Sequence, residues 1–254
     1  MGTVQTRFFS LIPILTAIVV LCATALGDTT TQGRAVFERY KDTVITMRVV
    51  VGTTFGGSES ESEQEANATL LDADGLAVLA LSAIDPMQMA ASFRMSVEEM
   101  TTRVVSMRMI LPDGSEKPAE VVLRDKDLDL VFVRLTEKPD GPLPFVSLDA
   151  AGAPEILDEV VCILQYGRVA RRAHAAFIER VEMIVERPRL FYALGDHRAR
   201  QLVCSPVFTL TGEFVGVGVM RSITSGEPSR DNIMVIIVPT AQIQELMAQV
   251  PPAE

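Results

Sequence analysis

The side chains of this chain best suited to chemistry are two neighbouring nucleophiles, Cys204 and Ser205, and two histidines, His174 and His197. A thiol or hydroxyl attacks a carbonyl carbon efficiently only when a base such as imidazole takes its proton. His197 precedes Cys204 by seven residues, so a cysteine–histidine pair is conceivable. A buried cysteine and a surface-loop histidine are the commoner arrangement, and His174 follows an arginine-rich stretch typical of a solvated loop. The reaction that such a pair could catalyse is acyl transfer.

The same residue types carry no metal or cofactor signature. Two isolated histidines without matching cysteine or carboxylate spacing do not form a zinc site, so we expect neither a metal nor a cofactor. The chain has 33 acidic against 23 basic residues and a formal charge of -10, which repels a phosphate backbone and argues against nucleic-acid binding. Arginines gather in residues 168–172 and recur at Arg187, Arg189, Arg198 and Arg200, either as a site for an acidic partner or as surface charge paired with acids.

Any such site must be positioned mainly by short strands. Runs rich in β-branched residues recur between turn signals, and a barrel or sandwich follows from many short strands with few helices. A helix is predicted over residues 240–250, where apolar residues follow helical spacing, and a short amphipathic piece over 33–42. The predicted strands are residues 43–54, 68–71, 102–111, 119–123, 130–135, 159–165, 175–186, 207–210, 213–220 and 233–238. Residues 56–65 are polar and acidic and are predicted to form a solvated loop or hairpin tip.

Three segments resemble parts of the HtrA/Deg type of trypsin-like serine protease. Asp72-Ala-Asp-Gly-Leu-Ala-Val-Leu-Ala-Leu-Ser-Ala-Ile84 is similar to the strand and turn that carry the family's general-base histidine, with Ser82 in that place. Asp127-Leu-Asp-Leu-Val-Phe-Val-Arg-Leu135 resembles the segment of the orienting aspartate, with Asp129 in that place. Gln201-Leu-Val-Cys-Ser-Pro-Val-Phe-Thr-Leu-Thr-Gly-Glu-Phe-Val-Gly216 resembles the nucleophile loop, with Val203 in the place of the serine.

The resemblance covers roughly residues 35–250, because the opening and closing segments also follow the family in order and spacing. It implies an all-β fold, the trypsin-like double β-barrel (chymotrypsin fold) with a C-terminal helix. The chain ends where the peptide-binding PDZ domain of many such proteases would start, so no PDZ domain is expected.

The resemblance also implies a degenerate triad without catalytic residues. Val203 offers no hydroxyl, and Ser82 cannot accept a proton at useful pH. Gln201, Cys204 and Ser205 stand where the family has glycines that shape the oxyanion hole. Losing the base and the nucleophile together costs on the order of a million-fold in rate.

Asp129 has two interpretations, a relic of the orienting carboxylate or a structural acceptor for backbone N–H groups and the Ser82 hydroxyl. With catalysis absent, the expected function is binding of an extended peptide, a protein or an active protease relative. The residues Val217, Gly218, Val219 and Met220 resemble the strand edge on which the family pairs its substrates. Two alternatives stay open: an active serine-type or cysteine-type endopeptidase using displaced residues such as Cys204 or Ser205, and a structural envelope protein.

Residues 1–27 are predicted to be a secretory signal peptide. Arg7 precedes an apolar run over residues 8–26, and small residues near its end could form a cleavage site. The protein is therefore expected to be exported, periplasmic or secreted. The alternative is a membrane anchor formed by residues 8–26 if the signal is not cleaved. A lipoprotein signal at Cys22 is disfavoured by the bulky Leu21 before it. Cys162 and Cys204 could pair outside the cytoplasm or stay buried thiols.

Overall fold

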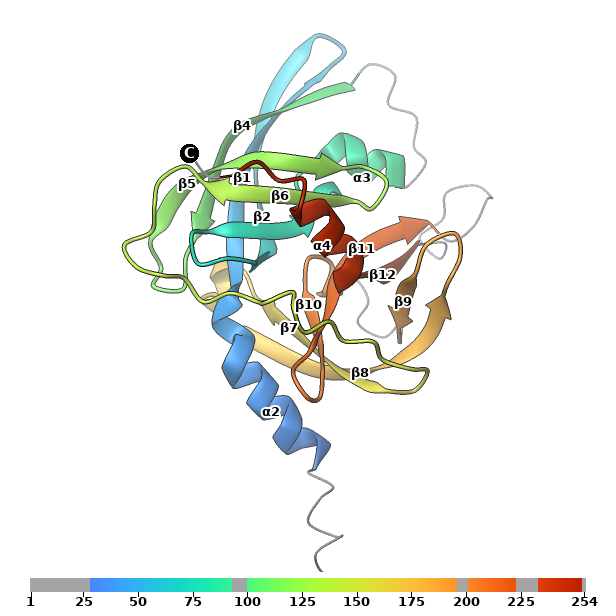
Figure 1. Cartoon of the computed structure of the whole chain (residues 1–254). Helices are drawn as coiled ribbons and strands as arrows, with labels where there is room; N and C mark the ends of the chain where they lie inside the picture. The colour runs from blue at the N-terminus through green and yellow to red at the C-terminus, as the bar shows by residue number, and fades with distance from the viewer. Residues whose placement is uncertain (1–27, 93–99, 196–200, 223–232, 253–254) are drawn as a thin grey trace, which may run out of the picture.

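Two closed antiparallel barrels of six strands each make up the computed structural model (Figure 1). The structure describes residues 28–92, 100–195, 201–222 and 233–252. The strand order is β1-β2-β3-β6-β5-β4 in the first barrel and β10-β11-β12-β9-β8-β7 in the second. The predicted all-β double barrel with a helix near the C-terminus is confirmed.

The first barrel uses the N-terminal half of the chain. Its strands are β1 (Val44–Phe55), β2 (Ser58–Leu70), β3 (Leu76–Ala80), β4 (Met100–Ile110), β5 (Glu116–Asp125) and β6 (Leu130–Leu135). The five residues of β3 are all buried, since this strand runs through the centre of the molecule. Gly75, at φ +95°, precedes it and leaves no room for a side chain, because a Cβ there would lie 2.5 Å from Leu135 Cδ1.

The second barrel uses the C-terminal half. Its strands are β7 (Glu159–Gln165), β8 (His174–Val185), β9 (Phe191–Leu194), β10 (Pro206–Thr209), β11 (Phe214–Ser222) and β12 (Ile233–Pro239). In β12 both faces are apolar, because one faces the barrel interior and the other faces the first barrel. A strand buried on both sides has this continuous apolar pattern.

Three helices of the described chain pack against the barrels. They are α2 (Thr29–Tyr40), α3 (Pro86–Ser92) and α4 (Thr240–Met247), with short 3-10 turns η1 (Lys41–Thr43), η2 (Leu81–Ala83) and η3 (Arg168–Ala170). Tyr40, at the end of α2, stacks on Phe208 of β10 with ring centroids 4.2 Å apart. Ile243 of α4 is buried in a core that joins residues of both barrels. Of the helices in the described ranges, none is long and apolar enough to cross a membrane.

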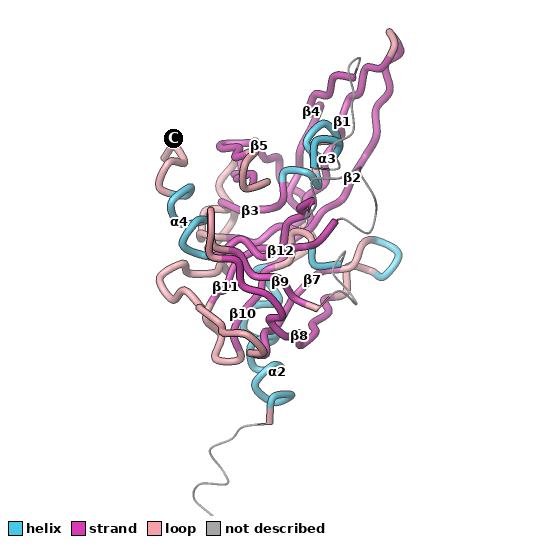
Figure 2. The backbone as a smooth tube through the Cα atoms, turned by 90° about the vertical axis from the view of Figure 1, so that its right-hand side faces the viewer, coloured by secondary structure: helices cyan, strands magenta, loops and turns pink. Residues whose placement is uncertain are grey.

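The acidic segment predicted as a loop is mostly strand. After a turn at Gly56-Gly57, β2 begins at Ser58 and pairs with β1 as far as Thr69. Residues 58–63 are all exposed, so the strand carries no apolar alternation that could reveal it in sequence. Together β1, β2 and β4 extend well beyond the barrel (Figures 1 and 2).

Three further elements differ from the sequence expectations. The strand β9 was not predicted, because its four residues are too few for a periodic signal. The short helix α3 was also not predicted. The amphipathic piece near the start is a 12-residue helix, longer than the eight residues of α4.

Candidate functional site

Ser82 and Asp129 meet at the end of β3. Strands β3 and β6 pair antiparallel with Ala80 opposite Leu130, so the residues that follow β3 lie beside those that precede β6. The Leu81 N–H donates to the Asp129 carbonyl at 2.9 Å. The Ser82 N–H donates to Asp129 Oδ1 at 2.8 Å, and the Ser82 hydroxyl donates to Oδ2 at 2.6 Å. Asp129 therefore accepts a backbone N–H and the Ser82 hydroxyl, which are the contacts that its structural interpretation requires.

The Asp129 carboxyl is fully buried and sits on a backbone with φ 56°. Burial raises its pKa above the ordinary value, and the two hydrogen bonds from Ser82 and the positive charge of Arg221 partly oppose this shift. Both carboxylate oxygens accept hydrogen bonds from Ser82, so the Asp129 carboxyl is a hydrogen-bonded part of the core.

The loop before β10 positions the two nucleophile candidates. The Cys204 N–H donates to the Gly218 carbonyl at 2.8 Å, and the Gly218 N–H donates to the Ser205 carbonyl at 3.0 Å. The Ser205 hydroxyl is directed to the Gln201 carbonyl at 3.3 Å. Both side chains are buried, Cys204 to 1% exposure and Ser205 to 0%.

Cys204 links this loop to the first barrel. Its Sγ accepts a hydrogen bond from the Ala80 N–H at 3.3 Å, two residues before Ser82. Burial raises the pKa of the Cys204 thiol to about 12, and the nearby Asp129 charge acts in the same direction. A thiol of this kind is protonated at neutral pH and is a poor nucleophile. Cys162 is likewise a buried free thiol, so the two cysteines do not pair.

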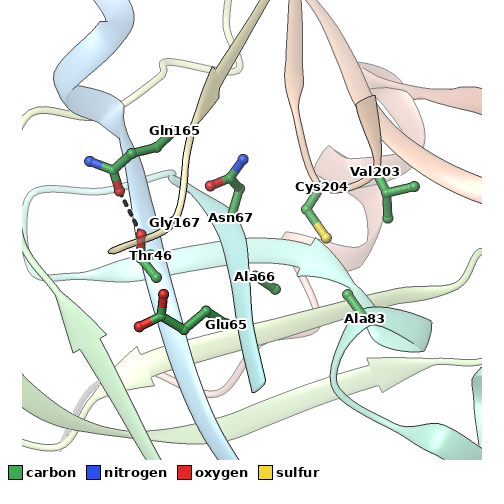
Figure 3. Close-up of a pocket in the computed structure, with 9 residues that line it drawn as sticks. All are labelled: Thr46, Glu65, Ala66, Asn67, Ala83, Gln165, Gly167, Val203 and Cys204. Atoms are coloured by element: carbon green, nitrogen blue, oxygen red, sulfur yellow. Dashed lines mark hydrogen bonds between the residues drawn. The ribbon is translucent and has the colours of Figure 1, made fainter. Parts of the chain in front are cut away.

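Val203 lies in a cleft between the barrels. The cleft holds a cavity of about 250 Å³, and Figure 3 shows the residues around it. The Thr46 hydroxyl of β1 donates to Gln165 Oε1 at the end of β7, 2.6 Å away, and so joins the two walls. The lining residues are Thr46, Glu65, Ala66, Asn67, Ala83, Gln165, Gly167, Val203 and Cys204. Ala83, next to Ser82, thus lines the same cleft as Val203, and Asp129 is joined to this segment through its hydrogen bonds to Ser82.

An ion pair borders the same cleft. Arg172, between η3 and β8, donates two hydrogen bonds to Glu65 of β2, at 2.7 and 3.2 Å. Arg48 approaches the same carboxylate at 3.5 Å. The hydrogen bonds from Arg172 lower the pKa of Glu65 below its ordinary value, although partial burial opposes this. Sequence reasoning missed this pair, because residues 65 and 172 lie in different barrels and neither belongs to a motif.

The predicted peptide-binding edge lies in the middle of β11. Val217 and Val219 are fully buried, and Met220 is half-buried. At Gly218 both backbone groups are bonded to the Cys204–Ser205 loop, and a Cβ there would lie 2.0 Å from the Leu202 carbonyl oxygen. Pairing of a peptide along Val217–Met220 stays a prediction.

The histidines do not complete a catalytic pair in the described chain. His174 begins β8, and its Nε2 lies 3.1 Å from the Val44 carbonyl oxygen and 3.3 Å from Gln165 Nε2. It therefore belongs to the junction of the barrels, and the expectation of a solvated loop was wrong. His197 lies outside the described residues. Within these ranges, no group of three or more histidine, cysteine or acidic residues could hold a metal ion.

The fold defines the class of this protein as a double β-barrel consistent with the chymotrypsin-like type. No protein-family model matches the chain, and no curated protein matches it significantly.

Proposed function

We propose that this protein is an exported, catalytically inactive relative of HtrA-type proteases that binds an extended peptide or protein segment in the cleft between its barrels. The resemblance of the Ser82, Asp129 and Val203 segments to the protease corners supports this assignment. A partner could equally be an active protease of the same type, since such a subunit would present extended segments to the same cleft.

The chemistry of the cleft supports inactivity. Hydrolysis needs a nucleophile and a base within hydrogen-bond reach of each other. Around Val203 the described nucleophile candidates are Cys204 and Ser205, and both are buried and already bonded. Ser82 stands where the resemblance would place the base, and its hydroxyl donates to the Asp129 carboxylate.

The observation that carries the binding proposal is the free edge of β2. In the described chain, β2 pairs with β3 only through Thr69 and Leu70, while Glu65, Ala66 and Asn67 line the cleft. The edge of a strand offers unpaired N–H and C=O groups, on which an extended peptide can add as another strand. Such pairing requires no catalytic residue.

The binding test uses fluorescently labelled peptides and unfolded proteins titrated into the purified mature protein. Ala83→Phe would fill part of the cavity and should weaken binding at least tenfold. The matched control is Ala150→Phe, which adds the same ring at an exposed position outside the cleft. Absence of binding at high micromolar concentration would remove the proposal.

Two other results would replace it. Turnover of casein that is abolished by Cys204→Ala or Ser205→Ala would establish an active endopeptidase. If the protein shows no binding and no turnover, the result would favour a structural envelope protein. N-terminal sequencing of the protein recovered from the cell envelope tests export, with cleavage expected near residue 27 and an intact N-terminus indicating an anchor.

A further inference from the structure

A second cavity, of about 670 Å³, lies against the outer face of the second barrel. It shares no lining residue with the cleft around Val203. Its walls come from strands β8, β9, β11 and β12, from helix α4 and from the segment that precedes β9. The first barrel adds Asp127 and Leu128. The proposed function makes no use of it.

The apolar lining follows from the double burial of β12. Val235 and Ile237 face the interior of the second barrel, so Met234, Ile236 and Val238 face outward. The first barrel covers only part of this outward face. Ile236 is 4% exposed and Val238 1%, whereas Met234 is half-buried, as are Met183, Val185, Leu190 and Phe191.

The floor of the cavity runs along β12. From Met234 to Val238 the strand covers about 13 Å, at roughly 3.3 Å a residue. Arg221 is the cross-strand partner of Met234 and therefore marks one end. Gln242 of α4 marks the other end, where its side-chain amide donates to the Leu190 carbonyl at 2.6 Å. A long apolar floor thus has a cation at one end.

The charges at this cavity are Arg221, Arg189 and Asp127. Arg221 is half-buried, whereas Arg189 and Asp127 are exposed. Neither arginine forms an ion pair with another residue in the described part of the chain. The lining itself thus has two cations against one carboxylate, which favours an anionic head group, and Arg221 also interacts with the buried Asp129 carboxyl.

We propose that this cavity binds a single-chain carboxylate amphiphile, of the chemical class of a fatty acid, with its chain along β12 and its carboxylate at Arg221. A peptide fits the lining less well, because its buried N–H and C=O groups would need partners. The one side-chain amide in the lining, that of Gln242, is already bonded to Leu190. An acyl chain has no such groups.

The first test needs no variant. A dansyl-labelled undecanoic acid is titrated into the full-length wild-type protein, and unlabelled dodecanoate, dodecanol, dodecylamine and an apolar peptide compete for it. Dodecanoate should displace the probe at about a tenfold lower concentration than dodecanol, because a charge-assisted hydrogen bond at a half-buried arginine is lost with the alcohol. Dodecylamine should be weaker still.

Variants then place the site. Met183→Trp fills the cavity and should abolish probe binding, whereas Met100→Trp, at a half-buried methionine far away on β4, should leave it unchanged. Arg221→Gln should remove the preference for the carboxylate, and Arg221→Lys should restore part of it. Far-ultraviolet circular dichroism verifies that each variant is folded.

Three outcomes would overturn the proposal: equal displacement by dodecanol and dodecanoate, undiminished binding by folded Met183→Trp, or stronger displacement by the peptide. The last would assign the cavity to a peptide ligand. The result is independent of the cleft, because Ala83→Phe should impair peptide binding without affecting the probe.

Discussion

Asp129 is the one ionisable carboxyl or basic group that is completely buried in the described chain, and its surroundings supply it with hydrogen-bond donors. A buried carboxylate is costly unless hydrogen bonds satisfy its oxygens. Ser82 supplies two of them, one from its backbone and one from its hydroxyl. A pair that could be the remnant of a catalytic arrangement therefore also holds the ends of β3 and β6 together.

Ser82→Ala should destabilise the protein by about 1–3 kcal/mol at neutral pH, because one oxygen of a buried acid loses its donor. The Ser82 bonds lower the pKa of Asp129, so they stabilise its ionised form. The loss should therefore be larger above the pKa of Asp129 and smaller once acid protonates it. Urea unfolding over a pH series measures this. Ser60→Ala, at an exposed position on β2, should change stability by less than about 0.5 kcal/mol.

Cys204 and Cys162 should resist alkylation in the native protein. Burial raises both thiol pKa values, that of Cys204 to about 12, so both thiols are protonated at pH 7. Iodoacetamide should label both residues quickly in denaturant and very slowly without it, as peptide mass spectrometry can follow. Rapid labelling of native Cys204 alone would identify it as an activated nucleophile and favour the peptidase alternative.

At the residue level, the sequence predicted the Ser82–Asp129 contact and missed the others. That contact joins two segments whose roles the family resemblance already related. The Ala80–Cys204 and Glu65–Arg172 contacts join barrels whose relative placement no local pattern encodes. Their partners are separated by more than one hundred residues, so only the tertiary fold brings them together.

Among the elements, strands with long buried runs were the predictable ones. The bounds of β6 and β7 agree with the predicted residues 130–135 and 159–165. The acidic strand β2 was not recognised. Its exposed part is held by backbone pairing to β1 and not by burial of side chains, so its sequence has no apolar pattern. Period-two alternation marks a strand only where one face meets a core.

The contact between β2 and the segment before β8 should respond to acid. A carboxyl with a lowered pKa stabilises the fold above its ordinary pKa, and this contribution is lost as the pH falls through the folded-state pKa. Arg172→Gln should cost about 1 kcal/mol at neutral pH, and the difference from the wild type should shrink as falling pH protonates Glu65.

Denaturant unfolding of both proteins from neutral to acidic pH provides the measurement. The matched variant is Arg180→Gln, whose ion pair with Glu159 spans 3.1 Å but involves a side chain that is 62% exposed. It should change stability far less. An equal effect of both substitutions at all pH values would show that Glu65 does not depend on Arg172.

At the scale of the whole molecule, the two barrels share one hydrophobic core. Phe132 of the first barrel, Phe208 of the second and Ile243 of α4 belong to the same buried cluster. The cluster continues through the ends of β3 and β11, so neither barrel can lose its packing without exposing apolar surface of the other. Val203 of the cleft packs against this cluster, and Ile236 and Val238 of the second cavity belong to it.

The barrels should therefore unfold together, and the chain contains a convenient reporter. It has three tyrosines and no tryptophan. Tyr166 and Tyr192 belong to the second barrel, and Tyr40 stacks on Phe208 of that barrel. Tyrosine fluorescence thus follows the second barrel, whereas far-ultraviolet circular dichroism follows both. Coincident urea transitions by the two probes are expected for one cooperative unit.

Ile243→Ala tests the coupling. Truncating a fully buried side chain in the shared cluster should cost about 2–4 kcal/mol, and both probes should shift by the same amount. Gln244→Ala, one position along on the exposed side of α4, should leave both midpoints nearly unchanged. If the fluorescence midpoint moved without the dichroism midpoint, the barrels would be independent folding units. The cleft would then be a contact between two separately stable barrels, and peptide binding there would have to work against a cleft that can open without unfolding.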